Sequence, residues 1–241
     1  MTKNGDYDHY VAWKKWEPSE STSIFVTQAY EAEFSNISIK SDAKILEIGF
    51  GDGRFLSWAK KKGYFCIGTE VIDELVSSSL SKGYEVYLGS ISDLPNEYLG
   101  KFDLICMWDV MEHMEKQALP LFFKKASDLL KKGGKIIIRV PNGSSPFSRH
   151  IQYGDFTHNT VISDRIIEQL ANPHGMILYN TSNSYRSITT GNKSGFKKYI
   201  GYICRDFIEI IIGYLYFGKR VPLDPVITVI LKKTNIQATS E

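Results

Sequence analysis

The sequence has few cysteines, and their positions suit neither disulfides nor metal binding. Cys66, Cys106 and Cys204 lie far apart and include no CxxC pair, so neither a disulfide framework nor a thiolate zinc site is predicted. This usage is typical of a protein of the reducing cytoplasm. The first ten residues are polar and lack the apolar run of a secretion signal, so export is not expected.

Long apolar runs and an excess of charge of either sign are also missing. No stretch of about 18 residues is clearly apolar and uncharged, which argues against a membrane-spanning helix. The 29 Lys and Arg residues nearly balance the 27 Asp and Glu residues, and the net charge of +2 does not indicate a nucleic-acid partner. With 43% apolar and 23% charged residues among 241, the composition excludes intrinsic disorder and favours one decorated domain.

Short strand-like runs alternate with helical patterns through the middle of the chain. The predicted strands are residues 44–48, 64–68, 85–88, 102–107 and 135–140, and the helical patterns between them cover residues 54–62, 73–82 and about 119–131. Gly133 and Gly134 are expected to end the last of these helices. This alternation is typical of a doubly wound, Rossmann-like α/β sheet with helices on both faces.

Helical segments flank this block on both sides. Residues 1–40 are predicted to form an N-terminal helical cap, and residues 41–241 the main domain with a helical insertion at about 195–220. A further helix is expected to begin with Ser163 as its N-cap. Strands are expected near residues 176–180 and 225–231. The cap contains an aromatic stretch (Tyr7, Tyr10, Trp13 and Trp16) and a second helix at about 24–34.

A glycine-rich turn directly follows the first strand, in Glu47-Ile-Gly49-Phe-Gly51-Asp-Gly53. Glycine allows a sharp turn with positive φ and lets a ligand approach the backbone. A dinucleotide fingerprint needs Gly or Ala at the sixth position, where this chain has Arg54 or Leu56, depending on the starting glycine. Glu70 closes the second strand and can accept hydrogen bonds from ribose hydroxyls. The turn therefore favours an adenosine-containing ligand over a nicotinamide dinucleotide.

The E-x-G-x-G-x-G turn, followed by an acidic residue that closes the second strand, resembles the class I S-adenosylmethionine (SAM)-dependent methyltransferases. Residues 88–95, 102–113 and 129–142 are similar to the third, fourth and fifth motifs of that family, in the same order. The resemblance implies a methyltransferase enzyme with SAM as its cofactor. It also implies a mostly parallel sheet whose last strand is antiparallel.

The resemblance also assigns the cofactor contacts. It places the glycine turn with Glu47, Gly49, Gly51 and Gly53 at the methionine part, Glu70 at the ribose, Ser90, Ile91 and Ser92 at the adenine, and Asp109 near the methionine end. Members of the family often have Asp where this chain has Ser90. The contact with the adenine amino group is therefore expected from a hydroxyl or a backbone carbonyl.

Methyl transfer to a hydroxyl also needs a group that takes the proton. His158 lies in a polar loop after the fifth strand, and Asp155 is spaced to orient its imidazole or raise its basicity. A hydrogen bond that only staples the loop is the alternative. His113, in the Glu112-His113 pair after the fourth strand, is another catalytic candidate, or it holds the floor of the site. With Asp109 these residues show no dedicated metal spacing, so no metal is predicted.

The acceptor is suggested only by a second resemblance. Residues 140–158 resemble a subgroup of these methyltransferases found with bacterial surface-polysaccharide biosynthesis, which implies O-methylation of a sugar or a lipid-linked saccharide. Three alternatives stay open. They are a small-molecule, quinone-like O-methyltransferase, an NAD-dependent oxidoreductase, and a non-catalytic SAM-binding protein.

An apolar helix with basic ends is expected at about residues 196–217. From Lys193 to Lys233 there are eight basic and three acidic residues, a net charge of +5. An apolar face with cationic ends is typical of a helix that lies on an anionic membrane. A lid or a homodimer helix is the other interpretation. The protein is accordingly expected to be cytoplasmic, either dissolved or peripheral at the inner face of the membrane.

Overall fold

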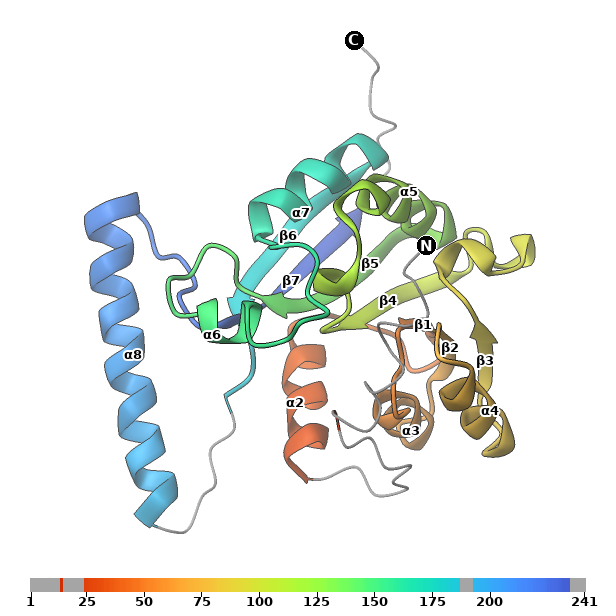
Figure 1. Ribbon diagram of the computed structural model, residues 1–241, viewed down its shortest axis with the longest axis horizontal. Coiled ribbons are helices and arrows are strands. Elements are labelled where there is room, and N and C mark those ends of the chain that lie inside the picture. The colour runs from red at the N-terminus through yellow and green to blue at the C-terminus, as the bar shows by residue number, and fades with distance from the viewer. Residues whose placement is uncertain (1–13, 15–23, 187–192, 235–241) are drawn as a thin grey trace.

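A single seven-stranded sheet with helices on both faces makes up the domain, which confirms the expected Rossmann-like α/β class (Figure 1). The computed structural model describes residue 14, residues 24–186 and residues 193–234. The strands are β1 (Lys44–Ile48), β2 (Phe65–Glu70), β3 (Glu85–Leu88), β4 (Phe102–Trp108), β5 (Leu130–Pro141), β6 (Met176–Asn183) and β7 (Val226–Lys233). The α-helices are α2 (Ile24–Ser35), α3 (Arg54–Lys61), α4 (Asp73–Ser81), α5 (Leu119–Leu129), α6 (Arg149–Gln152), α7 (Asp164–Ala171) and α8 (Lys193–Phe217).

The strands follow the order β3-β2-β1-β4-β5-β7-β6. β1 to β5 pair in parallel, and β7 runs antiparallel to both β5 and β6, as expected of the last strand. The order reverses between β1 and β4. In open α/β sheets such a reversal leaves a crevice at the carboxyl ends of the strands, and ligands bind there.

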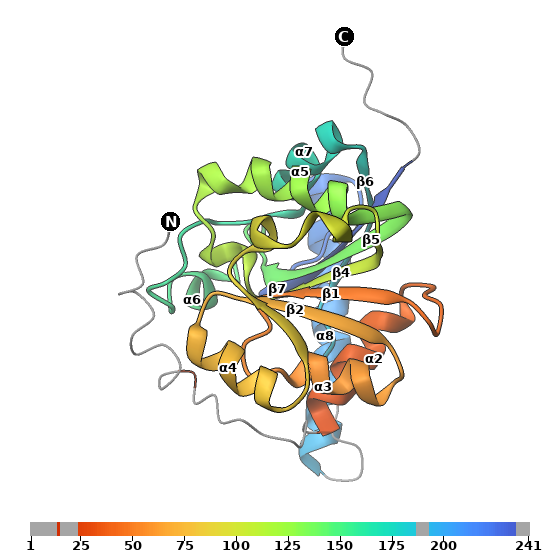
Figure 2. The same ribbon diagram turned by 90° about the vertical axis from the view of Figure 1, so that its right-hand side faces the viewer.

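Alternate residues of each strand supply the two faces of the sheet. In β4, Ile105 and Met107 pack in the core under α5 and α7, whereas Leu104 and Cys106 pack in the aromatic core under α2 and α3. Figures 1 and 2 show these helix pairs on opposite sides of the sheet. Each fully buried aliphatic side chain contributes about 1.5–3 kcal/mol.

Aromatic side chains hold α2 against the domain. Tyr30 and Phe34 of α2 pack on Phe55 and Trp58 of α3, and the ring centroids of Phe34 and Trp58 lie 4.7 Å apart. Such edge-to-face contacts stabilise beyond their buried area. α2 lies where the second helix of the cap was predicted, while Tyr7, Tyr10, Trp13 and Trp16 lie outside the described residues.

The end of α5 differs from the prediction. The helix ends at Leu129, and Gly133 and Gly134 lie inside β5 instead of ending the helix. The reason is that Leu130 already pairs with Phe102 of β4, and the register then shifts before Leu104. Gly133, with φ of +75°, lies within this irregular stretch. By contrast, the predicted cap of α7 is confirmed, because the Ser163 hydroxyl accepts from the Ile166 N–H at 3.3 Å.

Candidate functional site

A cavity of about 570 Å³ opens at the carboxyl edge of the sheet, where β1 and β4 meet. Its size is ordinary for a pocket that holds a small molecule. Its walls come from the turns after β1, β2, β3 and β4, from β5 and from α2. Most of the predicted cofactor residues line it, namely Glu47, Gly49, Gly51, Glu70, Ser90, Ile91 and Asp109. Gly53 does not line it; it has φ of +78° and serves as the N-cap residue of α3.

The turn after β1 requires glycine. Gly49 has φ of +66°, and a Cβ at this position would lie 2.7 Å from Cγ2 of Val110. Any larger residue would therefore push the turn away from the segment that follows β4. Gly51 also has positive φ, and its N–H donates to Oε2 of Glu70 at 3.0 Å. The turn thus forms a fixed backbone cradle at the cavity wall.

Glu70 ends β2 with its carboxylate fixed by backbone donors. In addition to Gly51, the N–H groups of Val71 and Ile72 donate to Oε1, at 2.7 and 3.2 Å. Burial raises the pKa of Glu70, and these three hydrogen bonds oppose that shift. Among the described residues, Oε2 accepts one hydrogen bond only, from Gly51, so it keeps a free acceptor site. Glu70 can therefore accept a hydrogen bond from a hydroxyl group of a ribose.

Two further residues that line the cavity have a polar side-chain atom without a hydrogen-bond partner in the described part of the chain. Within the described residues, Oε2 of Glu47 and Oγ1 of Thr69 are buried without a hydrogen-bond partner. Buried polar atoms are seldom left unpaired. Burial raises the pKa of Glu47 well above its ordinary value, and the nearby carboxylates of Asp52 and Glu70 add to the shift. A ligand that carries hydrogen-bond donors would satisfy both groups.

The Ser90 hydroxyl is engaged in hydrogen bonds with neighbouring residues of its own turn. Its hydroxyl donates to Oδ2 of Asp93 at 2.8 Å and accepts from the Ser92 N–H, which caps the short 3-10 helix Ile91–Asp93. The Ile91 side chain is buried and lines the cavity. The main role of the Ser90 hydroxyl in this structure is therefore to stabilise the turn.

Asp109 is held by an arginine that the sequence analysis did not single out. Arg139 of β5 donates from Nε and Nη2 to the two carboxylate oxygens of Asp109, at 3.1 and 2.5 Å. Asp109 has φ of +57°, an unusual conformation for a residue other than glycine and one that is often found at functional sites. The only sequence signal for Arg139 was a charge within an otherwise apolar strand.

Aromatic side chains that the sequence did not indicate also line the cavity, and we call this part of its wall the aromatic end. Phe25 and Tyr30 come from α2, Trp108 from the end of β4, and Tyr185 from the segment after β6. The guanidinium of Arg139 lies 5.6 Å from the ring centroid of Trp108. This end combines flat apolar surfaces with a cation, in contrast to the carboxylates at the glycine turn.

His113 is the predicted catalytic residue that lines the cavity. Its Nδ1 lies 3.2 Å from the backbone carbonyl oxygen of Thr157 and 2.9 Å from Oγ1 of the same residue. A carbonyl only accepts, so Nδ1 carries the proton and Nε2 carries the lone pair. Burial, and then the neighbouring His158, lower the pKa of His113 to about 4. The ring is therefore neutral at physiological pH.

Asp155 reaches His113 through Thr157. The Thr157 hydroxyl donates to Oδ1 of Asp155 at 2.6 Å, and the Thr157 N–H donates to the same oxygen at 3.0 Å. Lys14 lies 3.1 Å from the other oxygen, Oδ2. Burial raises the pKa of Asp155, but the bonds from Thr157 and Lys14 outweigh it and lower the pKa overall. Thr157 was not anticipated as a link.

His158 is not among the residues that line the cavity. Its Nδ1 donates to the backbone oxygen of Gln152 at 3.0 Å. Its Nε2 lies 3.9 Å from Asp155 Oδ2 and 4.0 Å from Glu112 Oε1, too far for a hydrogen bond with either carboxylate. The expected pairing of Asp155 with His158 is thus looser than the link from Asp155 to His113.

The loop that carries these residues is bound to the segment after β4. The N–H groups of Asn159 and Thr160 both donate to the backbone oxygen of Glu112, and the Asn159 side chain donates to the His113 carbonyl. The Thr160 hydroxyl donates to the carbonyl of Met114 at 2.7 Å. These bonds place His158 beside His113 although 44 residues separate them in sequence.

Three of these side chains could also hold a metal ion. Glu112, His113 and His158 each place one ligand atom within 4.8 Å of the others. Imidazole and carboxylate ligands together suit a divalent transition metal. Two features weigh against a cation here. Burial, followed by the charge of Asp109, raises the pKa of Glu112 well above its ordinary value, and the Lys14 ammonium already lies against Asp155.

Residues 25–188 match the family model described as "Methyltransferase domain". No curated protein sequence matches the chain at a significant level. Solved structures share the fold at low identity. A SAM-dependent methyltransferase from Archaeoglobus fulgidus has a TM-score of 0.61 and 16% identity, over 94% of this chain and 100% of that one.

Two ligand-bound structures are also similar. Phosphoethanolamine N-methyltransferase 2 of Haemonchus contortus, in complex with SAM, has a TM-score of 0.64 and 13% identity, over 98% of this chain and 61% of that one. The 1,6-didemethyltoxoflavin-N1-methyltransferase of Burkholderia thailandensis, with its substrate and S-adenosylhomocysteine bound, has a TM-score of 0.59 and 11% identity. That match covers 96% of this chain and 85% of the other.

Proposed function

The chain belongs to the methyltransferase domain family and is a SAM-dependent methyltransferase, and we propose that it methylates a hydroxyl oxygen of a sugar or a lipid-linked saccharide. The observation that carries this proposal is the position of His113. Its neutral imidazole lines the cavity with Nδ1 held by Thr157, so the lone pair on Nε2 is fixed to accept a proton. An O-methyltransferase needs such a group because the acceptor hydroxyl must lose its proton.

We propose that the carboxylate end of the cavity holds SAM. When bound, SAM supplies a methyl group on a sulfonium, which is already activated for transfer. The glycine turn from Gly49 to Gly53 would lie against the methionine part, Glu70 would accept from the ribose hydroxyls, and Ile91 would contact the adenine. Glu47 and Thr69, whose buried oxygens lack partners among the described residues, would accept from donors on the ligand.

His113, Asp155 and His158 are proposed to act as one unit. An acceptor oxygen that takes up the methyl group would give its proton to Nε2 of His113, and S-adenosylhomocysteine would leave as the other product. Asp155 acts through Thr157 as a positioning residue, because it fixes the tautomer of His113. The His158 ring packs against the His113 ring and supports it, and burial of the two histidines excludes water. The proton leaves to solvent after product release.

The aromatic end of the cavity supports a saccharide acceptor. Tyr30, Trp108 and Tyr185 offer flat apolar surfaces on which the C–H faces of a sugar ring can pack. Arg139 and Asp109 supply a donor and an acceptor beside them for ring hydroxyls. A small aromatic hydroxyl compound, such as a quinol, could stack on the same rings and is the second candidate. We also propose that residues 1–40 form a cap over this end. If the acceptor is lipid-linked, we propose that the enzyme acts at the inner face of the membrane.

Calorimetry with SAM tests the cofactor site. The wild-type chain should bind SAM, and Glu70→Ala should bind about tenfold or more weakly, because it loses a charged acceptor. Glu74→Ala, at an exposed position on α4, is the matched control and should bind as the wild type does. No binding of SAM by the wild type at millimolar concentration would overturn the proposal.

Acceptor screening tests the substrate class. Isotope-labelled SAM is supplied with free saccharides, polyprenyl-linked saccharides or catechols, and the methylated product is identified by mass spectrometry and NMR. An O-methyl sugar supports the proposal. Transfer only to catechols, or only to nitrogen, would contradict it.

A further inference from the structure

α8 is bound to the domain through its polar residues. Glu209 is only 3% exposed, and it accepts from the Asn183 side chain at 2.6 Å, from the Leu223 N–H at 3.0 Å and from Arg220 Nε at 2.8 Å. Burial opposes ionisation of Glu209, but these three donors lower its pKa overall. A carboxylate on a helix thus takes the inward position that an apolar side chain usually occupies.

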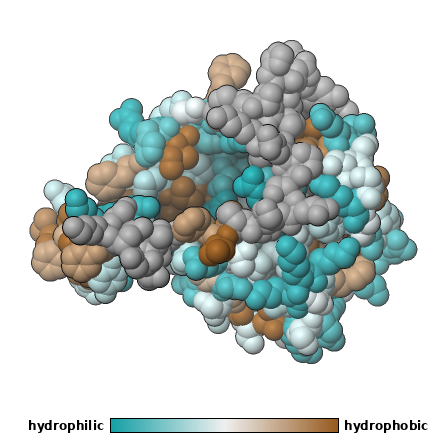
Figure 3. Space-filling model, turned by 90° about the horizontal axis from the view of Figure 1, so that it is seen from below, coloured by the Kyte–Doolittle hydropathy of each residue, from teal (hydrophilic) through white to brown (hydrophobic). Residues whose placement is uncertain are grey.

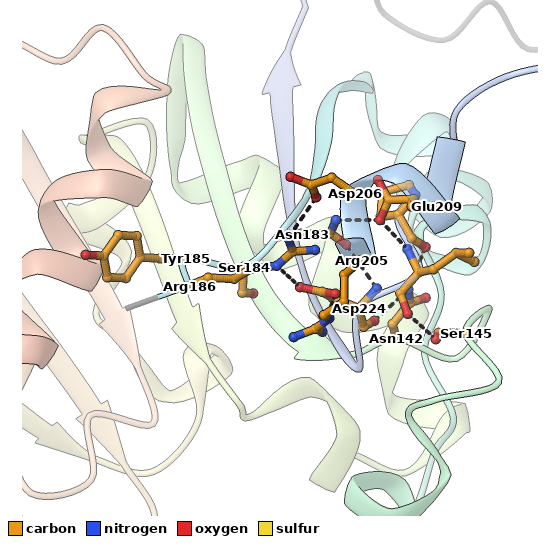
Figure 4. A network of polar contacts seen from close by, with 12 residues as sticks. Asn142, Ser145, Asn183, Ser184, Tyr185, Arg186, Arg205, Asp206, Glu209 and Asp224 are labelled. Carbon is orange, nitrogen blue, oxygen red and sulfur yellow. Dashed lines mark hydrogen bonds and ion pairs between the residues drawn. The ribbon is translucent and has the colours of Figure 1, made fainter. Parts of the chain in front are cut away.

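Ion pairs extend this attachment along the helix. Arg186, directly after the β6 region, pairs with Asp206 of α8 at 2.7 Å and with Asp224, and Arg205 of α8 also pairs with Asp224. The closeness of α8 to the returning chain is also marked by Gly213, where a Cβ would lie 2.7 Å from the Lys219 carbonyl. We call the group Asn183, Arg186, Arg205, Asp206, Glu209, Arg220 and Asp224 the polar clasp. Figure 4 shows the labelled side chains of this group converging between α8 and the ends of β6 and β7.

The apolar residues of α8 consequently point outward. Leu215 and Tyr216 are 73% and 74% exposed, and Phe207 is 63% exposed. The large apolar side chains of α8 that are exposed are Phe196, Tyr199, Ile200, Ile203, Phe207, Ile208, Ile210, Ile211, Tyr214, Leu215, Tyr216 and Phe217. Figure 1 shows α8 at one side of the molecule, and in Figure 3 it forms the lobe with brown side chains at the left edge. A contiguous surface of this kind marks an interaction site.

This surface does not cover the cavity. No residue of α8 is among the described residues that line it, so the structure gives no support to a lid. Nor is any helix in the described part of the chain long and apolar enough to cross a bilayer. Neither a lid nor a membrane-spanning helix therefore accounts for the exposed apolar side chains of α8.

The charges of the helix favour lipid over a second copy of the chain. Lys197 and Lys198 lie near its beginning and Lys219 just after its end, and all three are exposed. Asp206 and Glu209 are the only acidic residues of α8, and both belong to the polar clasp. Pairing two copies of α8, parallel or antiparallel, would bring lysines together without carboxylates between them. Anionic headgroups would instead neutralise them.

We propose that α8 docks the enzyme on an anionic lipid surface, with its outward apolar side chains in the headgroup and acyl boundary and its lysines at the phosphates. The helix then lies in the plane of the membrane, and the polar clasp keeps the domain attached to it. The docking surface is inferred from α8 alone. Its purpose, which is access to a lipid-linked acceptor, rests on the proposed function.

One dipeptide connects this surface with the acceptor end of the cavity. Tyr185 lines the cavity and its N–H donates to Glu33 of α2 at 3.0 Å, while the next residue, Arg186, enters the polar clasp. Figure 4 shows the two side chains pointing in opposite directions from one segment. The membrane helix and the acceptor end are thus fixed relative to each other by adjacent residues, so a lipid-linked acceptor held at the membrane is presented near the cavity.

Vesicle co-sedimentation with the full-length chain tests the proposal. Vesicles of phosphatidylcholine with phosphatidylglycerol should carry the wild type into the pellet, and vesicles of phosphatidylcholine alone should bind it less. The double variant Leu215→Ser with Tyr216→Ser should bind about tenfold or more weakly, because two large apolar side chains are lost from the lipid. The double variant Lys197→Glu with Lys198→Glu should lose the preference for anionic vesicles.

The control variant is Leu121→Ser in α5, which removes a leucine that is 54% exposed on a surface outside α8 and should sediment as the wild type does. Calorimetry with SAM should give the same affinity for all these variants, so loss of lipid binding is separated from failure of the proposed function. Light scattering of the free chain identifies the alternative. A stable dimer that binds to neither kind of vesicle would overturn the proposal. It would indicate that α8 mediates self-association.

Discussion

The imidazole of His158 packs edge-on against that of His113, with ring centroids 4.8 Å apart and planes at 73°, but only His113 lines the cavity. Each ring donates Nδ1–H to a backbone oxygen, of Gln152 for His158 and of Thr157 for His113. The two histidines therefore have the same tautomer and different access to a substrate. In the proposed mechanism, this difference makes His113 the residue that takes the proton and His158 a neighbour that holds the His113 ring in place.

Replacing the two histidines should have unequal effects on turnover. His113→Asn should lower kcat by about 100-fold or more, which is the usual contribution of a general base. His158→Asn should lower kcat less, because His113 keeps its bond to Thr157. Steady-state kinetics with a methylated product as readout measures both. An equal loss in both variants would mean that His158 itself faces the acceptor.

Thr157→Val should affect kcat and leave the KM for SAM unchanged. The substitution removes the hydroxyl that joins His113 to Asp155 but keeps the carbonyl that accepts from Nδ1, so a loss of about tenfold in kcat is expected. Thr157→Ser should restore most of the activity because it restores the hydroxyl. A purely structural role for Thr157 would change thermal stability and the KM for SAM as well.

Stability should fall between pH 6.5 and pH 4 partly through His113. In this range the unfolded chain binds a proton at His113, with a pKa near 6.5, and the folded chain does not, because its pKa is about 4. Stability is therefore fully present above pH 6.5 and decreases on acidification, by on the order of 3 kcal/mol, since each pKa unit is worth about 1.4 kcal/mol. Urea unfolding at several pH values should show a smaller decrease for His113→Gln. His174→Gln should keep the wild-type decrease.

Glu47→Gln should stabilise the free protein and weaken SAM binding. Because the folded pKa of Glu47 is raised, its ionisation is less favourable in the folded chain, and stability is lost as pH rises above the ordinary value of 4.5. At neutral pH the amide removes this penalty, and Tm should rise by about 2 °C or more. Calorimetry should show SAM binding weakened by about tenfold, since one of the two carboxyl oxygens is replaced by an amide NH2 group that cannot accept. Glu74→Gln should change neither quantity.

Removing divalent metals should leave methyl transfer unchanged. Glu112 favours its neutral form, and Lys14 already supplies positive charge beside Asp155. Turnover after dialysis against a chelator, with the chelator kept in the assay, measures this. A loss of activity that zinc or manganese restores, and that His158→Asn abolishes, would instead assign Glu112, His113 and His158 as metal ligands.

Much of the carboxylate end of the cavity, where we propose that SAM binds, follows from the sequence. Gly49, Gly51 and Glu70 lie at the ends of consecutive parallel strands, and parallel strands bring these ends to one edge of the sheet whatever the details of packing. The requirement for glycine in the turn after β1 and the position of Glu70 at the end of β2 depend only on nearby residues in the sequence. The Ser163 cap of α7 is local in the same way.

The tertiary structure alone decided which histidine lines the cavity and which side of α8 faces outward. The loop from Asp155 to Thr160 is bound largely through backbone oxygens of residues 112–114. Because almost any sequence can supply those oxygens, no sequence pattern predicts the contact. Likewise, helical periodicity indicates an apolar surface on α8 but not what covers it. The buried Glu209 and the ion pairs of Asp206 with Arg186 and of Arg205 with Asp224, which form only in the folded chain, show that its polar side faces the protein.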